Sequence, residues 1–500
     1  MNPMKNVRQL GNEPNVAQFP QTANVCRPSS ELLRHAPPQS EPSVLDELLP
    51  VSPKGPVKEI ANWGNYPVMA SEENTPVYLE DIRSYIRTPG TFIPRGNGRC
   101  YGDASLASRT ICTTRFDKIL SFDAAQGLFE CESGLTLDRI LEVVVPKGWF
   151  LPVTPGTKFI TAGGAIASDV HGKNHHVDGC FSHHVRDMDV LVADGRLITC
   201  GPDKETDLFE ATCGGMGLTG IITRIRFQLK KIETSYIRQK QVKAANLEEV
   251  LMLFDKYKDY TYSVAWIDCL KKGKGFGRSI LILGEHAAVS DLTPQQQKDP
   301  LQLPKKKQIT FPFNLPSWVL NSFTVRAFNF LYYRKNFKKE INNTVSYEPF
   351  FYPLDAILHW NRGYGKKGFI QYQFVLPMES KQGLIEILQT ISSKGLGSFL
   401  AVLKIFGKQE SLIGFPMEGY TLALDIPVRK GLFETLDQLD EIVLRHKGRL
   451  YMSKDARMKP DVLEAGYPNL ARFRSILRKY NPDQKLRSVQ SDRLFLTHKS

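Results

Sequence analysis

Three glycine-dense loops, each beside an expected strand, constrain this 500-residue chain more than any other feature. They read RGNGRCYGD at 95–103, TAGGAIASD at 161–169 and ATCGGMGLTGII at 211–222. Glycine tolerates positive φ and lets main-chain N–H groups approach an anion closely. One such loop is a weak signal, because a tight turn on a basic surface looks the same. Three within about 130 residues are far more specific.

The loops predict a site for a nucleotide diphosphate. Such a group carries about two negative charges, which suits a nest of N–H groups beside Arg95 and Arg99. The small residues from Ala162 to Ser168 would let the chain lie flush against a flat ligand. Neither a GxxxxGK[ST] loop nor a GxGxxG between strand and helix is present, so two common nucleotide folds are unsupported. If one ligand is bound, the three loops must converge in space.

The spacing of apolar residues predicts an α+β fold. Short strands are expected at 91–94, 110–114, 119–122, 128–132, 188–192, 197–199 and 220–229, with one helix near 137–145. Longer helices near 246–258, 380–393 and 430–445 then alternate with strands at 263–267, 369–375 and 423–426. We expect a ligand-binding domain at 56–232, a substrate domain at 233–440 with an antiparallel sheet and a flexible loop at about 287–316, and a C-terminal segment at 441–500. Residues 1–55, rich in Pro, Asn, Gln and Ser, predict a mobile extension.

The chain is basic, with 65 Lys and Arg against 52 Asp and Glu, a net charge of +13. This suits an anionic membrane face or a phosphorylated substrate. The basic clusters at 305–307 and 334–339 accompany no nucleic-acid-binding motif, so no nucleic acid is expected. Residues 318–339 combine seven aromatic side chains, among them Trp318, Phe323, Phe328, Phe330, Tyr332 and Tyr333, with lysine and arginine, which suits a membrane interface. An ordinary core-facing helix with a basic end is the alternative, and the sequence leaves it open.

The eight cysteines form no CxxC pair, which predicts a reducing compartment without disulfides or structural zinc. Neither a signal peptide nor a run of about eighteen apolar residues is present. We expect a cytoplasmic protein, and a peripheral place at the inner face of the membrane stays open. Five of the ten histidines lie between His171 and His184, but no carboxylate or cysteine completes a recognisable site, so no metal is expected.

The motifs RGNGRCYGD, PGTKFITAGGAIASDVHGKNHH, FEATCGGMGLTGII and RLYMSKDAR resemble those of the decaprenylphosphoryl-ribose oxidase group of FAD enzymes, in the vanillyl-alcohol-oxidase superfamily. The resemblance covers about residues 60–495. It implies a two-lobed PCMH-type FAD-binding domain, a cap domain, and a C-terminal segment that returns to the flavin. The residues it places at FAD are Arg95, Gly96, Asn97, Gly98, Arg99, Tyr101, Gly156, Thr157, Thr161, Gly163, Gly164, Ala167, Ser168, His171, Asn174, Gly217, Ile222 and Tyr451.

One position bears on how the flavin is held. Some related sugar oxidases link the flavin covalently through the histidine of an RGxGHS motif. Arg99 occupies that position here and cannot form the bond. We therefore expect non-covalent FAD.

Flavin oxidation of a secondary alcohol needs hydride delivery to the ring and a base for the hydroxyl proton. The candidates are Lys454, Tyr451, His171, Tyr101 and Lys173. The resemblance places the lysine of YxxKDxR, here Lys454, beside the flavin. A buried lysine can act as a base of lowered pKa or stay charged and polarise the hydroxyl, and both roles remain open.

The substrate-binding candidates are polar side chains of two kinds. Lys173 and Lys404 suit a phosphate. Gln371 and Gln373 share one strand face by the period of two, and paired amides commonly bind hydroxyls. Trp266 would stack on a sugar or fill the core, and Thr421 lies in a strand where Ala423 replaces a cysteine common in the family.

The resemblance implies oxidation of a sugar hydroxyl to a ketone, on a polyprenyl-phosphate-linked pentose, with a separate short-chain reductase acting on the ketone. Two alternatives remain. One is a soluble aldonolactone or alditol oxidase on the same fold. The other is a flavin-binding module without catalysis.

Overall fold

The computed structural model describes residues 55–304, 308–316 and 318–497. These described residues form one compact unit. The predicted mobile extension at 1–55 lies outside the described residues apart from Gly55, and so does the basic cluster at 305–307.

The first sheet leads directly into the first glycine loop. It has the order β1 (Val57–Ala61), β2 (Val68–Asn74), β4 (Arg109–Cys112), β3 (Ile93–Arg95). Helix α1 (Leu79–Arg87) buries Ile82 and Ile86 in one cluster with Phe92 and Ile111 of the sheet region. Because β3 ends at Arg95, the loop at 95–103 begins where the strand ends.

The second sheet is antiparallel, and the third glycine loop leads into one of its strands. Its order is β5 (Ile119–Asp123), β6 (Leu128–Glu132), β10 (Ile221–Gln228), β8 (Val185–Leu191), β9 (Leu197–Cys200). Ile225 and Phe227 of β10 point into the core, while Arg224 and Arg226 alternate outward. Helices α2 (Leu137–Val144), α3 (Ala162–Ala167) and α5 (Thr206–Thr212) belong to the same region. Every strand and helix predicted before residue 232 is confirmed, with ends that differ by a few residues.

The third sheet has eight antiparallel strands. Its order is β16 (Glu340–Ser346), β12 (Tyr236–Ala244), β14 (Ser279–His286), β13 (Tyr262–Ile267), β19 (Val402–Phe406), β20 (Gly419–Pro427), β18 (Phe369–Pro377), β21 (Arg449–Leu450). The predicted helices occur as α6 (Leu247–Lys256), α9 (Lys381–Lys394) and α10 (Leu432–Arg445), and α7 (Ser322–Lys335) and α8 (Tyr347–Phe351) lie between β14 and β18 in sequence. The predicted α+β class is confirmed.

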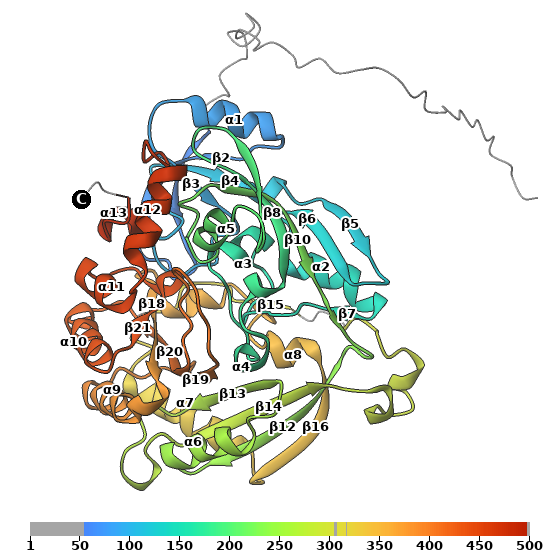
Figure 1. Cartoon of the computed structure of the whole chain (residues 1–500). Coiled ribbons are helices and arrows are strands. Elements are labelled where there is room, and N and C mark those ends of the chain that lie inside the picture. Colours follow the sequence, from blue (N-terminus) through green and yellow to red (C-terminus); the bar gives the residue numbers. More distant parts are fainter. Residues whose placement is uncertain (1–54, 305–307, 317, 498–500) are drawn as a thin grey trace, which may run out of the picture. The chain divides into compact units, whose positions relative to one another are not determined.

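The C-terminal segment returns to the first sheet, as Figure 1 shows for the red helices beside the blue strands. Helices α11 (Pro460–Gly466), α12 (Leu470–Tyr480) and α13 (Val489–Arg493) follow β21. The Phe92 N–H donates to the Lys485 carbonyl at 2.8 Å, and the Arg487 N–H donates to the Phe92 carbonyl at 2.9 Å. These bonds hold residues 485–487 next to β3. The motif RLYMSKDAR begins in β21, which pairs with β18 of the large sheet. The domain boundaries at 232 and 440 remain predictions.

The stretch at 287–316, expected to be a flexible loop, contains some regular structure. Strand β15 (Ile309–Thr310) pairs in parallel with β17 (Ile357–Leu358), and the Ser235 N–H donates to the Pro300 carbonyl at 2.8 Å. Whether the rest of the stretch moves stays a prediction. No helix among the described residues is both long and apolar enough to cross a membrane.

Arg493 of α13 joins the C-terminal segment to the first glycine loop by ion pairs. Its guanidinium lies 2.9 Å from Asp103 in the first glycine loop and 2.7 Å from Asp455, and both carboxylates are almost fully buried. Arg493→Met would leave two buried carboxylates close together, so we expect the free energy of unfolding to fall by about 3–5 kcal/mol. Urea unfolding followed by circular dichroism measures it. The more exposed ion pair of Arg487 with Asp492 is the control, and Arg487→Met should cost at most about 1 kcal/mol. Equal losses of unfolding free energy in the two variants would contradict this role of Arg493.

Candidate active site

The three glycine loops converge, as predicted. A Cβ on Gly96 would lie 2.4 Å from Thr161 Oγ1, so the first loop touches the second. The Met216 N–H donates to the Ala167 carbonyl at 2.9 Å, so the third loop also touches the second. Gly217, at φ +81°, approaches Pro94 so closely that a Cβ would lie 2.8 Å from its Cγ. Loops separated by more than a hundred residues therefore form one surface.

Part of that surface has hardly any side chains. In the second loop Ala162, Ala165 and Ile166 are buried, whereas Gly163, Gly164, Ala167 and Ser168 remain partly exposed. Gly156 is exposed, and a Cβ there would have no atom within 4 Å. Exposed main chain without side chains is what a flat ligand with a diphosphate requires. The residues present therefore fit FAD.

Several residues expected at FAD use their side chains to support the loops. Arg95 donates to Asn62 Oδ1 and to the Ala61 carbonyl, the latter at 2.9 Å, and Asn97 Nδ2 donates to the Phe159 carbonyl at 3.0 Å. Asn174 is buried and donates to the Pro152 carbonyl at 2.8 Å. Thr161 Oγ1 caps α3 by accepting from the Gly164 N–H.

Gly98 has φ +58° and lies against the Arg95 side chain, and the Arg99 guanidinium lies 4.1 Å from the Trp63 ring centroid. Thr157 Oγ1 accepts a hydrogen bond from the Phe159 N–H, and Ile222 is buried. Any contact of these residues with FAD stays a prediction.

The motif RLYMSKDAR brings Lys454 to the first loop. The Tyr101 N–H donates to the Ser453 carbonyl at 3.0 Å, and Lys454 Nζ lies 3.9 Å from the Tyr101 ring centroid. Tyr451 donates its hydroxyl to the Ser168 carbonyl at 2.9 Å and stacks on Phe415. Tyr451 is therefore a wall of the site with its hydroxyl already engaged, which leaves Lys454 as the freer candidate of the two.

The large sheet presents the substrate-binding candidates on one face. Gln373 lies opposite Ala423, and Gln371 lies opposite Asp425. Lys404 lies opposite Thr421, and Trp266 lies opposite Val402. Opposite residues, and residues two apart, share a face of an antiparallel sheet. Six side chains from four strands thus form one polar row: Trp266, Lys404, Thr421, Asp425, Gln371 and Gln373.

Hydrogen bonds and ring contacts fix the positions of side chains in this row. Gln373 Nε2 lies 3.3 Å from both Thr421 Oγ1 and His171 Nε2. The Trp266 indole N–H donates to the Phe399 carbonyl at 3.0 Å, and its ring centroid lies 4.8 Å from that of Tyr332. The row therefore reaches His171, two residues after the second glycine loop.

Three lysines meet at this row with little opposing charge. Burial lowers the pKa of Lys173 and of Lys404 to about 7, and each feels a neighbouring lysine. Burial lowers the pKa of Lys454 to about 8, and nearby Asp425 opposes that shift. Lys173 Nζ contacts the Phe350 carbonyl. Among ion pairs between described residues, none involves these three lysines. A bound anion would restore the balance of charge.

His171 sits among aromatic rings at the same place. Its ring centroid lies 4.7 Å from that of Phe406 and 5.2 Å from that of Tyr451. Burial, followed by the charge of Lys404, holds its pKa well below the ordinary value, so the ring is neutral. Its Nδ1 is buried without a hydrogen-bond partner. An unpaired buried nitrogen is costly, and a ligand hydroxyl could satisfy it.

Asp425 is a site residue that the sequence analysis missed. Gln371 Nε2 donates to Asp425 Oδ1 at 2.6 Å, whereas Oδ2 is buried without a partner. Burial raises the pKa of this carboxyl to about 7. The sequence signal that could have indicated it is a single acidic residue in the mostly apolar strand β20, which also holds Thr421.

The other histidines of the 171–184 cluster bind separate partners. His175 Nε2 lies 2.6 Å from Gln409 Oε1, and His176 Nε2 lies 2.9 Å from the Tyr260 carbonyl. Within the described part of the chain no group of three His, Cys, Asp or Glu residues could hold a metal ion.

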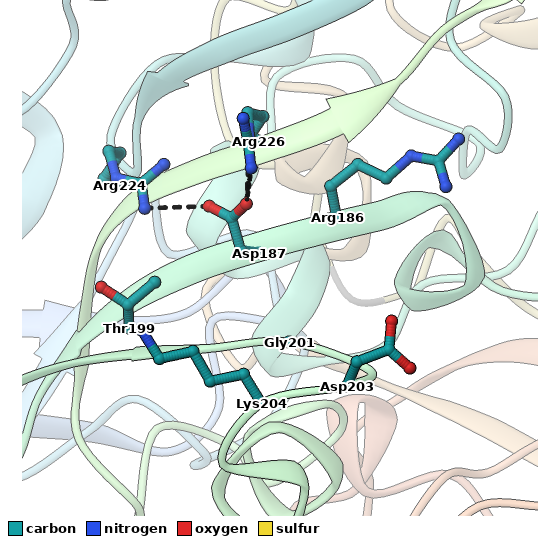
Figure 2. A pocket seen from close by; sticks show the side chains of 8 residues that line it. All are labelled: Arg186, Asp187, Thr199, Gly201, Asp203, Lys204, Arg224 and Arg226. Atoms are coloured by element: carbon teal, nitrogen blue, oxygen red, sulfur yellow. Dashed lines mark hydrogen bonds and ion pairs between the residues drawn. The ribbon is translucent and has the colours of Figure 1, made fainter.

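A surface depression of about 450 Å³ lies elsewhere, on the outward face of β8, β9 and β10. Figure 2 shows Arg224 and Arg226 both directed at Asp187 between them. Arg224 lies 2.9 Å from that carboxylate and 2.7 Å from Asp189. Because these charges are paired, the depression gives no sign of a ligand.

Comparison with known proteins agrees with this geometry. Residues 79–201 match the family described as FAD binding domain. The chain is 36% identical over 454 residues to the decaprenylphosphoryl-β-D-ribose oxidase of Mycolicibacterium smegmatis, across 88% of this chain and 98% of the relative. It is 31% identical over 374 residues to an uncharacterized protein of Streptomyces coelicolor, across 72% and 100%. A D-lactate dehydrogenase of Anaerostipes hadrus is 28% identical over 124 residues, 24% of this chain and 26% of the relative.

The first of these relatives spans both the glycine loops and the polar row of the large sheet. Its identity of 36% over 454 residues is high enough to show a common family. The match to the FAD binding domain family covers the first and the second glycine loop. The cofactor is FAD. The chain is an FAD-dependent oxidoreductase, and it belongs to the decaprenylphosphoryl-β-D-ribose oxidase family.

Proposed function

We propose that this protein oxidises a secondary hydroxyl of a polyprenyl-phosphate-linked pentose to a ketone, with non-covalent FAD as the hydride acceptor. The observation that carries this proposal is the pair of buried lysines, Lys173 and Lys404, beside the glutamine amides of the polar row. A neutral lactone or alditol would leave their charge uncompensated, whereas a substrate phosphate would pair with it.

In this proposal different side chains bind the sugar, bind the phosphate and accept the proton. Gln371 and Gln373 hold sugar hydroxyls on the sheet face, and His171 Nδ1 bonds another hydroxyl. Lys173 and Lys404 pair with the phosphate. Lys454, in its neutral form, accepts the proton of the reacting hydroxyl, while the aromatic rings around His171 exclude water. The chemistry that bound FAD supplies is acceptance of a hydride from the substrate carbon.

The pH dependence of the reaction follows from Lys454. The base must be neutral, so the rate constant of flavin reduction should rise with pH and level off above about 8, the pKa of Lys454. Asp425 favours the charged lysine, so Asp425→Asn should lower that pKa and move the rise to lower pH. Stopped-flow absorbance measures both profiles. A rate that falls above about pH 8 would instead assign Lys454 as a charged stabiliser.

A turnover assay separates the proposed function from its alternatives. The purified full chain is given a polyprenyl-phospho-pentose, free pentoses, aldonolactones and alditols in parallel. We expect oxidation of the lipid-linked sugar alone. Rapid oxidation of the free compounds would favour the soluble lactone or alditol oxidase, and a flavin that no compound reduces would favour a binding module.

The proposed product also defines a partner. A ketone on a lipid-linked sugar needs a second enzyme to reduce it if the result is to be an epimer. A short-chain reductase is the partner class that we propose, on the basis of the family resemblance.

A further inference from the structure

Helix α7 exposes apolar side chains to solvent along one of its faces. Phe323 is 77% exposed, Phe330 43% and Leu331 67%. The buried face holds Val325 and Asn329, and Asn329 donates to Asp268 Oδ1 at 2.8 Å. Positions 323, 327, 330 and 331 follow the helical spacing of one stripe, so the exposed apolar residues form a continuous face. In a helix that serves only to face the core, these solvent-exposed positions would be polar.

Two further exposed aromatic side chains flank the helix in sequence. Trp318 is 74% exposed and precedes α7, and Phe337, 94% exposed, follows it. Trp and Phe at this position are typical of a surface that enters the interface of a bilayer.

The same segment is strongly basic. Residues 318–339 contain five Lys and Arg and no Asp or Glu. The Arg334 guanidinium lies 4.5 Å from the Phe330 ring centroid, so positive charge borders the apolar stripe directly. Apolar side chains ringed by cations match an anionic lipid leaflet, which offers an apolar interior below negative headgroups.

A series of aromatic rings joins this surface to the candidate active site. Phe328 of α7 lies 5.5 Å from Phe399, which lies 5.7 Å from Tyr364. Tyr364 stacks on Phe369 at 4.1 Å, and Phe369 lies 5.5 Å from Tyr101, the ring beside Lys454. Packed rings therefore connect Phe328 of α7 with Tyr101, which is one wall of the site.

We propose that residues 318–339, with α7 at their centre, dock on an anionic lipid bilayer and set the entrance of the active site against it. Docking itself does not depend on the substrate. Its use, to let a polyprenyl chain stay in the bilayer while the sugar reaches Lys454, rests on the proposed function. The proposal adds a surface and its partner to that function.

Vesicle flotation of the FAD-loaded full chain tests the docking. We expect binding to phosphatidylcholine vesicles that contain phosphatidylglycerol, weak binding to phosphatidylcholine alone, and release by salt. The double variant Phe323→Ser/Leu331→Ser should lower the partition coefficient at least about tenfold. The double variant Val177→Ser/Met252→Ser is the control, because it removes two apolar side chains of 55% and 58% exposure outside this segment. Equal binding by the two variants would overturn the proposal.

Two further measurements keep the outcomes distinct. Light scattering would show whether Phe323→Ser/Leu331→Ser dissociates a dimer; if so, a second copy covers this face and the bilayer proposal fails. Turnover of a water-soluble short-chain phospho-pentose should be the same in parent and variant. If the parent turns over this compound but ignores vesicles, the docking proposal fails and the proposed function stands. If the parent binds vesicles but oxidises no phospho-sugar, the proposed function fails and the docking proposal stands.

Discussion

Lys454→Ala is expected to slow the reduction of the flavin by substrate at least about a hundredfold, while the protein keeps its FAD. The reason is geometric. Lys454 Nζ stands over Tyr101, its pKa lies near 8, and its neighbour Tyr451 has already engaged its hydroxyl with Ser168. No other group of the motif is as well placed to take a proton. Stopped-flow absorbance without oxygen measures the rate constant.

The control is Lys459→Ala, five residues further along the chain. The Lys459 side chain is 58% exposed and pairs with Asp437, so its loss should leave the rate constant unchanged. A Lys454→Ala protein that is reduced as fast as its parent would remove Lys454 from the reaction and direct attention to His171.

Gly217→Ala is expected to weaken FAD binding at least about tenfold, or 1.4 kcal/mol, and to destabilise the fold. At φ +81° an alanine is strained by about 1–3 kcal/mol. Its Cβ would also lie 2.8 Å from Pro94, which is two residues before Gly96. Relief of this clash moves the first glycine loop away from the third. Titration of the apoprotein with FAD, followed by flavin fluorescence, measures the affinity.

A glycine of similar φ separates the two effects. Gly273 has φ +66°, but a Cβ there would meet no atom within 4 Å. Gly273→Ala should therefore carry the strain alone, with FAD affinity unchanged. Equal losses of affinity in both variants would show that the loop contact with Pro94 is unimportant.

The local features of the fold could be predicted from the sequence because they are encoded locally. Loop 95–103 and strand Leu128–Glu132 are specified by glycines and by alternation within a few residues. The period of two was also sufficient to place Gln371 and Gln373 on one face.

The assembly of the site could not be predicted in the same way. Strand order in the large sheet decides that Lys404 and Asp425 join the two glutamines, and strand order depends on pairings between distant residues. Arg95 illustrates the same limit. Its residue type suits a diphosphate, yet Asn62, thirty-three residues earlier, provides a buried partner that turns the guanidinium into the protein.

The orientation of α7 was open for a related reason. Its sequence contains apolar side chains on nearly all sides, so periodicity alone could not tell which face is buried. The structure buries Asn329 because Asp268, already paired with Arg278, offers it a hydrogen bond. Phe323 and Leu331 are then left on the outside.

One spectroscopic titration tests most directly whether three converging loops hold a reducible, non-covalent flavin beside Lys454. The visible absorption of the purified full chain is recorded without oxygen, before and after addition of a polyprenyl-phospho-pentose, and the protein is then precipitated with acid. We predict a flavin spectrum that bleaches on addition of the sugar and a flavin that stays in the supernatant. A colourless protein that takes up no FAD, or a flavin that the lipid-linked sugar leaves oxidised, would contradict this.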